Sequence, residues 1–463
     1  MSQHETGSIR RLRGRRIDAT VALAVALPLV ALGAVALTTP DTSAPASQPP
    51  QSAPLESASL VCPAAAPGGD TVTTALGVSG SASVTAAGSS SSSQTALSAG
   101  KPQQLRVGPA AQILSFNGSG APTLAASRWS PSPLAATECG PAVTGEWFTG
   151  LGAGPYHDSV IELTNPLSGD AVVDLDVFGA KGLVPSSQLQ GVAVPAHGTV
   201  SFDLLHTIPR LDTLAVHATV VRGQAAISVR DHGRLLSGAH AVTDWVSGQA
   251  WPSTSNLLLG LLPQGGSNRL VVANPGNDQL DATLKLVTPS SVFEPAGAPK
   301  IQVPPQSVVT LSLDKLLHRP LAAGAFGIEL DSTGPVTAEL RRLAGADLTT
   351  TSAGPAVAAP ASVVVPPGDK RLVVAGAKRA GALTVTSYDS GGHRLKTQRL
   401  TLTPQQGSML TLPKGAVLVA LTSDNNTAYV GSVVADTATG SAVLPVRSVP
   451  DSVRVPAVRP ELH

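Results

Sequence analysis

The chain has 463 residues, of which 42% are hydrophobic and 13% are charged, and its formal net charge is +1. This length accommodates roughly three domains of ordinary size. Their cores must be built from small aliphatic side chains, because aromatic residues make up only 3% of the chain. A near-neutral chain offers no basic face to displace phosphate counterions, so we expect no nucleic acid among its partners.

The first predicted element is a membrane segment. Residues 1–16 form a basic tail, and residues 17–39 contain an uncharged run that begins at Ala19. About 20 helical residues cross the ~30 Å hydrocarbon core of a bilayer, so this run predicts a transmembrane signal anchor. The positive-inside rule then places the tail in the cytoplasm and the bulk of the chain outside, in a single-pass protein of the cell membrane. The arginines of the tail are Arg10, Arg11, Arg13, Arg15 and Arg16.

A cleavable signal peptide is the alternative to the anchor, because Ala-x-Ala patterns end at Ala36 and Ala46. The apolar cores of signal peptides usually span about 7–15 residues, which is shorter than this run, so the pattern favours retention. Residues 40–58 follow as a Pro/Ser-rich linker. Such a tract is extended and semi-rigid, and it would space the folded part from the membrane.

An internal repeat organises the rest of the chain. Asn165-Pro166 and Asn274-Pro275 each lie between two alternating apolar runs, and the two asparagines are 274 − 165 = 109 residues apart. A further copy without Asn-Pro follows them, and a degenerate copy precedes them. The predicted β units are residues 59–145, 146–250, 251–358 and 359–463.

Each full unit contains six or seven short alternating runs separated by Gly, Pro, Asn or Asp. Alternation indicates strands with one buried and one wet face, so the predicted fold class is all-β with antiparallel sheets. Units of about 100 residues favour tandem immunoglobulin-like β-sandwiches. A β-propeller built from the same repeats is the alternative, and sharing of entry strands between units would suit such a ring.

Cys62 and Cys139 are the two cysteines, and both lie on the exported side of the predicted anchor. An oxidising compartment favours a disulfide between them. The sequence contains no C-x-x-C redox motif, so we expect this bond to be structural.

Candidate chemistry is weak throughout the chain. Tyr156-His157-Asp158-Ser159 places three triad residue types side by side, but neighbours on an extended chain point to opposite sides, and we expect a polar loop leading into the strand at Val160. His232 and His240 with Asp231 offer metal-ligand chemistry without a zinc-like spacing. We therefore predict no catalytic residue, no metal site and no cofactor.

The tryptophans are the remaining candidates for recognition. Trp147 opens the second unit, and Trp245 and Trp251 flank the entry to the third. Large side chains at junctions fill gaps between units in a chain otherwise poor in aromatics. As the functional alternative, Trp147, Trp245 and Trp251 would contact sugar rings or a protein partner.

Three stretches carry a resemblance to a known family: "CPAAAPGG" from Cys62, "ECGPAVTGEWFTGLGAG" from Glu138, and "IELTNP" from Ile161. With the Arg-rich anchor, they resemble an actinobacterial family of membrane-anchored, exported all-β proteins of unknown function. The resemblance implies a location and an architecture, and it transfers no catalytic residue.

The leading functional hypothesis is therefore a non-enzymatic scaffold or protein-interaction module of the cell envelope, held to the membrane by its N-terminal helix. Binding of cell-wall glycan through the junction tryptophans is the second hypothesis. The third is an uncharacterised hydrolase whose site is assembled from separate loops, which would require a cleft containing at least two titratable groups.

Overall fold

The computed structural model describes residues 19–38, 51–234, 241–262, 265–448 and 452–455. The chain divides into two compact parts, one made of Met1–Ala53 and Arg454–His463 and the other of Pro54–Val453. The terminal part contains the helix α1 (Ala19–Thr38), with Pro28 inside it. Within the described residues, no helix combines the length and the apolar character that a membrane crossing requires. The tail arginines and Ala46 lie outside the described residues, and the signal anchor stays a prediction.

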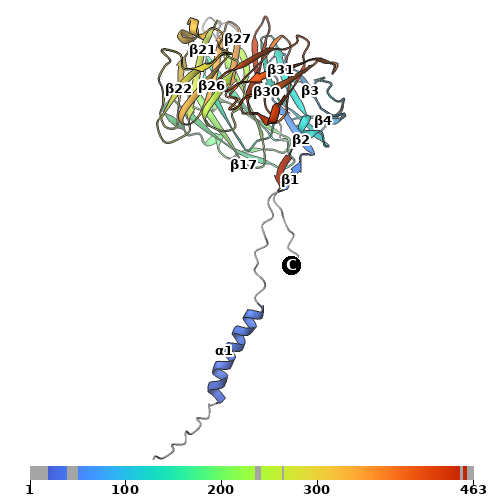
Figure 1. Cartoon of the computed structure of the whole chain (residues 1–463), viewed down its shortest axis with the longest axis vertical. Coiled ribbons are helices and arrows are strands. Elements are labelled where there is room, and N and C mark those ends of the chain that lie inside the picture. Colours follow the sequence, from blue (N-terminus) through green and yellow to red (C-terminus); the bar gives the residue numbers. More distant parts are fainter. Residues whose placement is uncertain (1–18, 39–50, 235–240, 263–264, 449–451, 456–463) are drawn as a thin grey trace, which may run out of the picture. The chain divides into compact units, whose positions relative to one another are not determined.

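The Pro54–Val453 body is all-β, as predicted, and its strands form four successive groups that we call unit one to unit four (Figure 1). Unit one has a five-stranded sheet of order β10-β2-β7-β4-β5 and a four-stranded sheet of order β6-β3-β8-β9. Its elements are β2 (Ser57–Cys62), β3 (Thr71–Ala75), β4 (Gly80–Ala86), β5 (Ser92–Leu97), β6 (Gln103–Arg106), β7 (Gln112–Asn117), the 3-10 helix η1 (Ala121–Thr123), β8 (Ala125–Pro131), β9 (Leu134–Glu138) and β10 (Gly140–Pro141).

Unit two forms one nine-stranded sheet, because β11 pairs with β17 along most of its length and with β12 at its end. Around that link the sheet has two halves, one containing β13 and β17 and the other containing β12, β18 and β19. Its elements are β11 (Gly145–Gly154), β12 (His157–Thr164), β13 (Ala171–Gly179), β14 (Gly182–Val184), η2 (Ser187–Leu189), β15 (Val192–Val194), β16 (Thr199–Asp203), α2 (Leu204–Thr207), β17 (Leu211–Arg222), β18 (Ala226–Gly233) and β19 (Val242–Val246).

Unit three is organised around the 18-residue strand β26, which continues through Gly334 and Pro335. It pairs first with β20 and β22 and then with β21 and β27. Its elements are β20 (Ser253–Leu259), β21 (Ser267–Asn274), β22 (Leu280–Val287), β23 (Val292–Phe293), β24 (Ile301–Val303), β25 (Ser307–Ser312), α3 (Asp314–Leu317), η3 (Pro320–Ala322), β26 (Gly327–Ala344) and β27 (Asp347–Ser352).

Unit four has two four-stranded sheets, of order β28-β33-β30-β31 and β32-β29-β34-β35. Beyond the four units, β1 (Gln51–Pro54) pairs with β36 (Ser452–Val455). The elements of unit four are β28 (Ala361–Val364), β29 (Asp369–Ala375), β30 (Gly381–Tyr388), β31 (Arg394–Leu402), β32 (Ser408–Thr411), β33 (Leu418–Ser423), η4 (Asp424–Asn426), β34 (Val430–Asp436) and β35 (Ser441–Pro445).

The two Asn-Pro sites have the same hydrogen bonds, which supports the repeat at atomic level. Asn165 is fully buried, and its Nδ2 donates to the carbonyls of Gly169 at 2.7 Å and Val194 at 3.2 Å. Asn274 is also fully buried and donates to Asp278 at 2.7 Å and Val303 at 3.1 Å. Each asparagine therefore fastens its own turn to the strand 29 residues further along, an arrangement that only a side-chain amide can make here.

Within each unit, the two sheets or half-sheets pack face to face around one apolar core. In unit four the core joins Leu383 of β30 to Leu372 of β29, and in unit three it joins Leu284 of β22 to Leu270 of β21. The inward positions are mostly Leu, Val and Ala, as the composition predicts.

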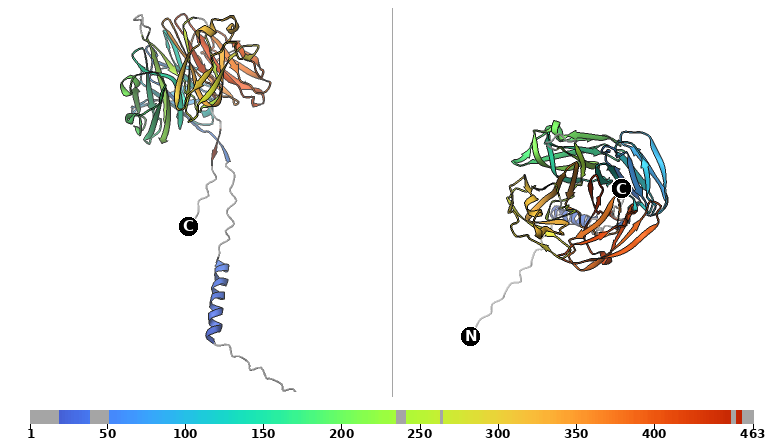
Figure 2. Two further views of the ribbon diagram at one scale, coloured as in Figure 1. Left: turned by 90° about the vertical axis from the view of Figure 1, so that its left-hand side faces the viewer. Right: turned by 90° about the horizontal axis from the view of Figure 1, so that it is seen from above.

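The four units close into a ring, so the body has a four-bladed, β-propeller-like arrangement (Figure 2). The final strands of the units meet at its centre, where β9 and β27 each lie beside both β19 and β35. The predicted string of immunoglobulin-like sandwiches is not confirmed, because the faces between units are buried as well. The apolar pairs across these faces are Ile113 with Ala226, Trp147 with Val271, Leu257 with Val373, and Val364 with Ala125.

The predicted disulfide between Cys62 and Cys139 is present, with Cα atoms 4.2 Å apart. Cys62 ends β2 in one sheet of unit one, and Cys139 follows β9 in the other. The bond therefore joins the two sheets of the unit whose sequence departs most from the repeat.

Candidate functional site

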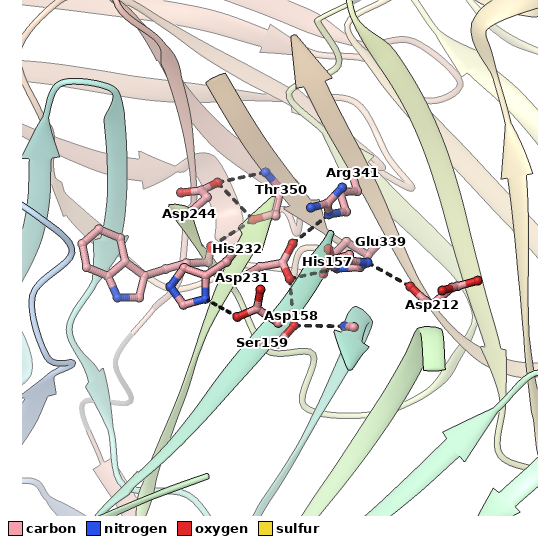
Figure 3. Close-up of polar contacts among 12 residues, drawn as sticks. His157, Asp158, Ser159, Asp212, Asp231, His232, Asp244, Glu339, Arg341 and Thr350 are labelled. Atoms are coloured by element: carbon pink, nitrogen blue, oxygen red, sulfur yellow. Dashed lines mark hydrogen bonds and ion pairs between the residues drawn. The ribbon is translucent and has the colours of Figure 1, made fainter. Parts of the chain in front are cut away.

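A cluster of buried polar side chains lies where unit two meets unit three. Strand register places the side chains there: Ser159 on β12 lies opposite Asp231 on β18, and Asp231 lies opposite Asp244 on β19. Strands β26 and β27 of unit three pack against unit two, and β26 contributes Glu339 and Arg341. Figure 3 shows the side chains converging on Asp231.

Asp231 is the hub of this cluster. Its side chain is fully buried, and its Oδ1 accepts hydrogen bonds from Ser159 Oγ at 2.7 Å and from His157 Nε2 at 2.9 Å. Its Oδ2 accepts from Arg341 Nε at 2.7 Å. Burial alone would raise the pKa of this carboxyl group, but the cationic partners His157 and Arg341 hold it below its usual range. Asp231 is therefore an ionised, fully occupied acceptor.

His157 connects the hub to the surface. Its Nδ1 lies 3.0 Å from the backbone oxygen of Asp212, and its Nε2 contacts the Asp231 carboxylate. A carbonyl and an ionised carboxylate can only accept, so both ring nitrogens donate, as they do in an imidazolium.

Two further carboxyl groups, those of Glu339 and Asp244, are buried near the hub, and burial raises the pKa of each. Desolvation raises the pKa of Glu339 well above its usual range, and repulsion by Asp231 raises it further. Ser352 Oγ donates to Glu339 Oε2 at 3.2 Å. The pKa of Asp244 is also raised well above its usual range by desolvation, although Asp244 accepts from Thr350 N at 2.9 Å. Burial thus favours the protonated forms of Glu339 and Asp244, whereas its cationic partners favour the ionised form of Asp231.

The geometry differs from that of a nucleophilic triad. In a triad the histidine lies between the serine and the acid, whereas here Asp231 lies between Ser159 and His157. The Ser159 hydroxyl donates to the carboxylate and accepts from Gly152 N at 3.0 Å. The expected polar loop before Val160 is wrong, because β12 already begins at His157. Asp158 points to the other face, where its Oδ2 lies 3.3 Å from Nδ1 of His232.

A cavity of about 600 Å³ opens beside this cluster, and His157 and Arg341 form part of its wall. Its other lining residues come from the β11–β12 turn, from the start of β17 and the residue before it, from the residue after β18, and from β21 and β26. The full lining is Gly154, Pro155, Tyr156, His157, Arg210, Asp212, Arg234, Ser267, Arg269, Arg341 and Leu343.

The three candidate tryptophans have different surroundings. Trp147 is 5% exposed and stacks on His217 at the junction with unit three, with ring centroids 4.2 Å apart. Trp245 is 3% exposed and packs against Ala66 and Ala135 of unit one. Trp251 is 74% exposed. Trp147 and Trp245 therefore pack at junctions between units, and of the three only Trp251 offers its ring to a ligand or partner.

Metal-ligand chemistry finds no geometric support in the described part of the chain, where no three His, Cys, Asp or Glu side chains are placed to hold an ion. Asp231 is already occupied by its three partners, and His232 contacts Asp158. His240 lies outside the described residues.

Sequence reasoning missed Glu339, Arg341, Asp244 and Thr350. A usable signal lies in "AELRRL", where Glu339 and Arg341 are two residues apart on a strand and so share one face. Charges at such positions in a run that is otherwise buried indicate a polar junction, but the alternation alone does not say which strand faces them.

Comparison with known proteins identifies a family for this chain, but that family has no known activity. The model described as a family of unknown function (DUF5719) matches residues 107–413. That range begins in unit one and ends in unit four, so it includes the whole polar junction between units two and three. No curated protein matches the chain.

Proposed function

The chain belongs to the DUF5719 family of unknown function, and from this premise we propose that it is a non-enzymatic, membrane-anchored module of the cell envelope that binds another envelope component. The observation that carries the proposal is that buried ionisable groups of the body form contacts between neighbouring units. Asp231 and Arg341 join unit two to unit three at 2.7 Å, and Glu162 of unit two accepts from Ala64 N of unit one at 2.8 Å. Both contacts hold units together.

A rigid ring of this kind suits recognition, because a binding surface on packed strands loses little conformational entropy when it is occupied. Trp251 is the best-placed contact, since its ring is exposed next to polar groups. Gln249 Nε2 donates to the Trp251 carbonyl at 2.8 Å and to Asn256 Oδ1 at 2.7 Å, which fixes the backbone beneath the ring.

Photo-cross-linking in the native host tests the interaction. A photoreactive phenylalanine analogue replaces Trp251 in the full chain, and the same analogue at Val221, which is 61% exposed, is the matched control. A discrete adduct at position 251 that is absent at position 221 supports a protein partner. The same result at both positions, or at neither, contradicts a protein-interaction role for Trp251.

Cell-wall glycan is the second candidate ligand, favoured by the exposed indole of Trp251, because aromatic faces bind sugar rings. Retention of the full chain on isolated cell-wall polysaccharide, with loss in Trp251→Ala and not in Leu183→Ala, would favour glycan. Leu183 is 47% exposed in unit two and serves as the apolar control. Equal retention of both variants would exclude Trp251 as the glycan contact.

Anchoring is a separable part of the proposal, supported by the arginine cluster and the uncharged run in residues 17–39. Membrane fractionation with N-terminal sequencing tests it. A membrane-bound chain that keeps its N-terminal tail supports the anchor, whereas a mature protein that begins after Ala36 or Ala46 would show a cleaved signal peptide.

A further inference from the structure

The cavity beside the polar junction has an unusual wall. Four of its eleven lining residues are arginines, contributed by both units: Arg210 and Arg234 from unit two, and Arg269 and Arg341 from unit three. A volume of about 600 Å³ lies in the range of small-molecule sites. Arginine is the side chain best suited to bidentate recognition of planar or tetrahedral anions.

Three of these arginines have side chains free to bind a ligand. Arg210, Arg234 and Arg269 are exposed, and within the described residues their guanidinium groups make no hydrogen bond or ion pair. The backbone N–H of Arg234 donates a hydrogen bond to the Tyr156 carbonyl at 3.0 Å. That bond fixes where the side chain starts at the rim.

Arg341 supplies a fixed positive charge at the back of the wall. The residue is 8% exposed, its Nε is bonded to Asp231, and its Nη2 is buried without a partner among the described residues. Because Nη2 has almost no accessible surface, Arg341 adds its charge to the cavity, and the exposed arginines supply the donors for a ligand.

Strand register makes the case stronger. Arg269 of β21 lies directly opposite Arg341 of β26, and like charges in directly opposed positions destabilise a sheet. An anion bound in the cavity would offset that repulsion.

The local charge sets the class of ligand. The four guanidinium groups and the carboxylates of Asp212 and Asp231 give a net charge of 4 − 2 = +2 around the cavity, without counting His157. This charge matches a phosphate dianion better than a single carboxylate, and the guanidinium fork fits phosphate oxygens.

We propose that the cavity between units two and three is a binding site for a phosphate group, held by Arg210, Arg234 and Arg269 and attracted by the charge of Arg341. The group belongs either to a soluble phosphate or to the headgroup of an anionic lipid. Tyr156, which is 54% exposed, adds a hydroxyl donor to the same wall. Trp251 does not line the cavity, so this site and the proposed Trp251 contact can be tested separately.

The test is isothermal titration of the full-length chain with inorganic phosphate, using sodium acetate as the carboxylate probe. Arg210→Gln and Arg269→Gln should each weaken phosphate binding about tenfold, the usual effect of one lost charge-assisted bond. Arg222→Gln is the matched control, an exposed arginine of unit two outside the cavity, and should change the affinity less than twofold. Without phosphate, Arg269→Gln should melt no lower than the wild type, because it removes the repulsion with Arg341.

A second arm distinguishes the sources of phosphate. Binding to vesicles of phosphatidylcholine, with and without phosphatidylglycerol, is compared for the wild type and for Arg210→Gln/Arg269→Gln. Any other membrane contact is the same in the two proteins and does not affect the difference between them. Selective binding of phosphatidylglycerol that the double variant loses identifies a lipid headgroup, and binding of inorganic phosphate identifies a soluble ligand. Absence of both, acetate binding as tight as phosphate binding, or an equal loss in Arg222→Gln would each overturn the proposal.

Discussion

Removing the charge of Asp231 tests whether the junction between units two and three depends on that carboxylate. Asp231→Asn keeps the size of the side chain but leaves Arg341, which is 8% exposed, without its anionic partner. Breaking a buried ion pair from one side costs about 3–5 kcal/mol. The two bonds from Ser159 and His157 weaken as well, so we expect a loss of unfolding free energy in the upper part of that range.

Glu339 limits the loss. Repulsion by Asp231 contributes to its raised pKa, so Asp231→Asn lowers that pKa and favours an ionised Glu339 near Arg341. In Asp231→Asn/Glu339→Gln, no carboxylate of Glu339 can take the place of Asp231 beside Arg341. This double variant should therefore be less stable than Asp231→Asn alone. Glu339→Gln alone should cost less than about 1 kcal/mol, because it replaces one neutral group with another.

The assay is urea unfolding of the full chain followed by tryptophan fluorescence, which reports on all four tryptophans, including Trp245 in the neighbouring strand β19. Asp212→Asn is the matched control: Asp212 is exposed and contacts His157 only through its backbone oxygen, so its replacement should cost less than about 0.5 kcal/mol. A loss below about 1 kcal/mol for Asp231→Asn, or no difference between that variant and the double variant, would refute this account.

Three further predictions follow from the fold. Cys62→Ser/Cys139→Ser opens a loop with a sequence separation of 77 residues and should lower the unfolding free energy by about 4.5 kcal/mol as an upper estimate, measured by urea unfolding against the oxidised wild type. Asn165→Ala and Asn274→Ala each remove three or four buried hydrogen bonds and should cost about 3–4 kcal/mol, within about 1 kcal/mol of each other. The melting temperature should fall as the pH rises from about 4 to about 6, because burial raises the pKa of Asp347 to about 6 and a carboxyl group with a raised pKa favours folding only while it is protonated. Asp231, whose pKa is lowered, acts in the opposite sense and loses its contribution as the pH drops below about 4.

Each of these has its own control. The two serine substitutions should be no less stable than the wild type in reductant, and a larger loss would point to packing instead of the bond. Asn277→Ala, at an exposed position of the same turn, should be nearly silent, so an equal loss there would contradict the role of the buried amides. Asp347→Asn should flatten the pH dependence between about 4 and about 6, and an unchanged slope would assign it to other groups.

The sequence predicted the parts of the fold that are encoded locally. Alternation located the strands, and the spacing of Asn165 and Asn274 located the repeat, because both signals need only neighbouring residues and a turn. Closure of the ring has no such signal. The contact of Val364 with Ala125 depends on small side chains that occur everywhere in this chain, so nothing marks them as an interface.

The candidate site was visible only in part, for the same reason. His157, Ser159 and Asp231 were all noted in the sequence, but their contacts bridge 72 and 74 residues. Arg341 lies 110 residues beyond Asp231. Pairing of β12 with β18 brings the first three together, and the junction between units adds the fourth. Arg210, Arg234 and Arg269, whose side chains form no ion pair with any residue that the structure describes, resembled ordinary surface residues.

Ring closure has a consequence for how the chain reaches its native state. Ser127 Oγ of unit one donates to the Val364 carbonyl of unit four at 2.8 Å, across 237 residues. In an open array each new repeat is stabilised by the repeat before it. Here unit one keeps one face uncovered until unit four has been made and folded. A chain truncated after unit three would expose apolar surface at both of its ends, so biogenesis must shield these edges until synthesis is nearly complete.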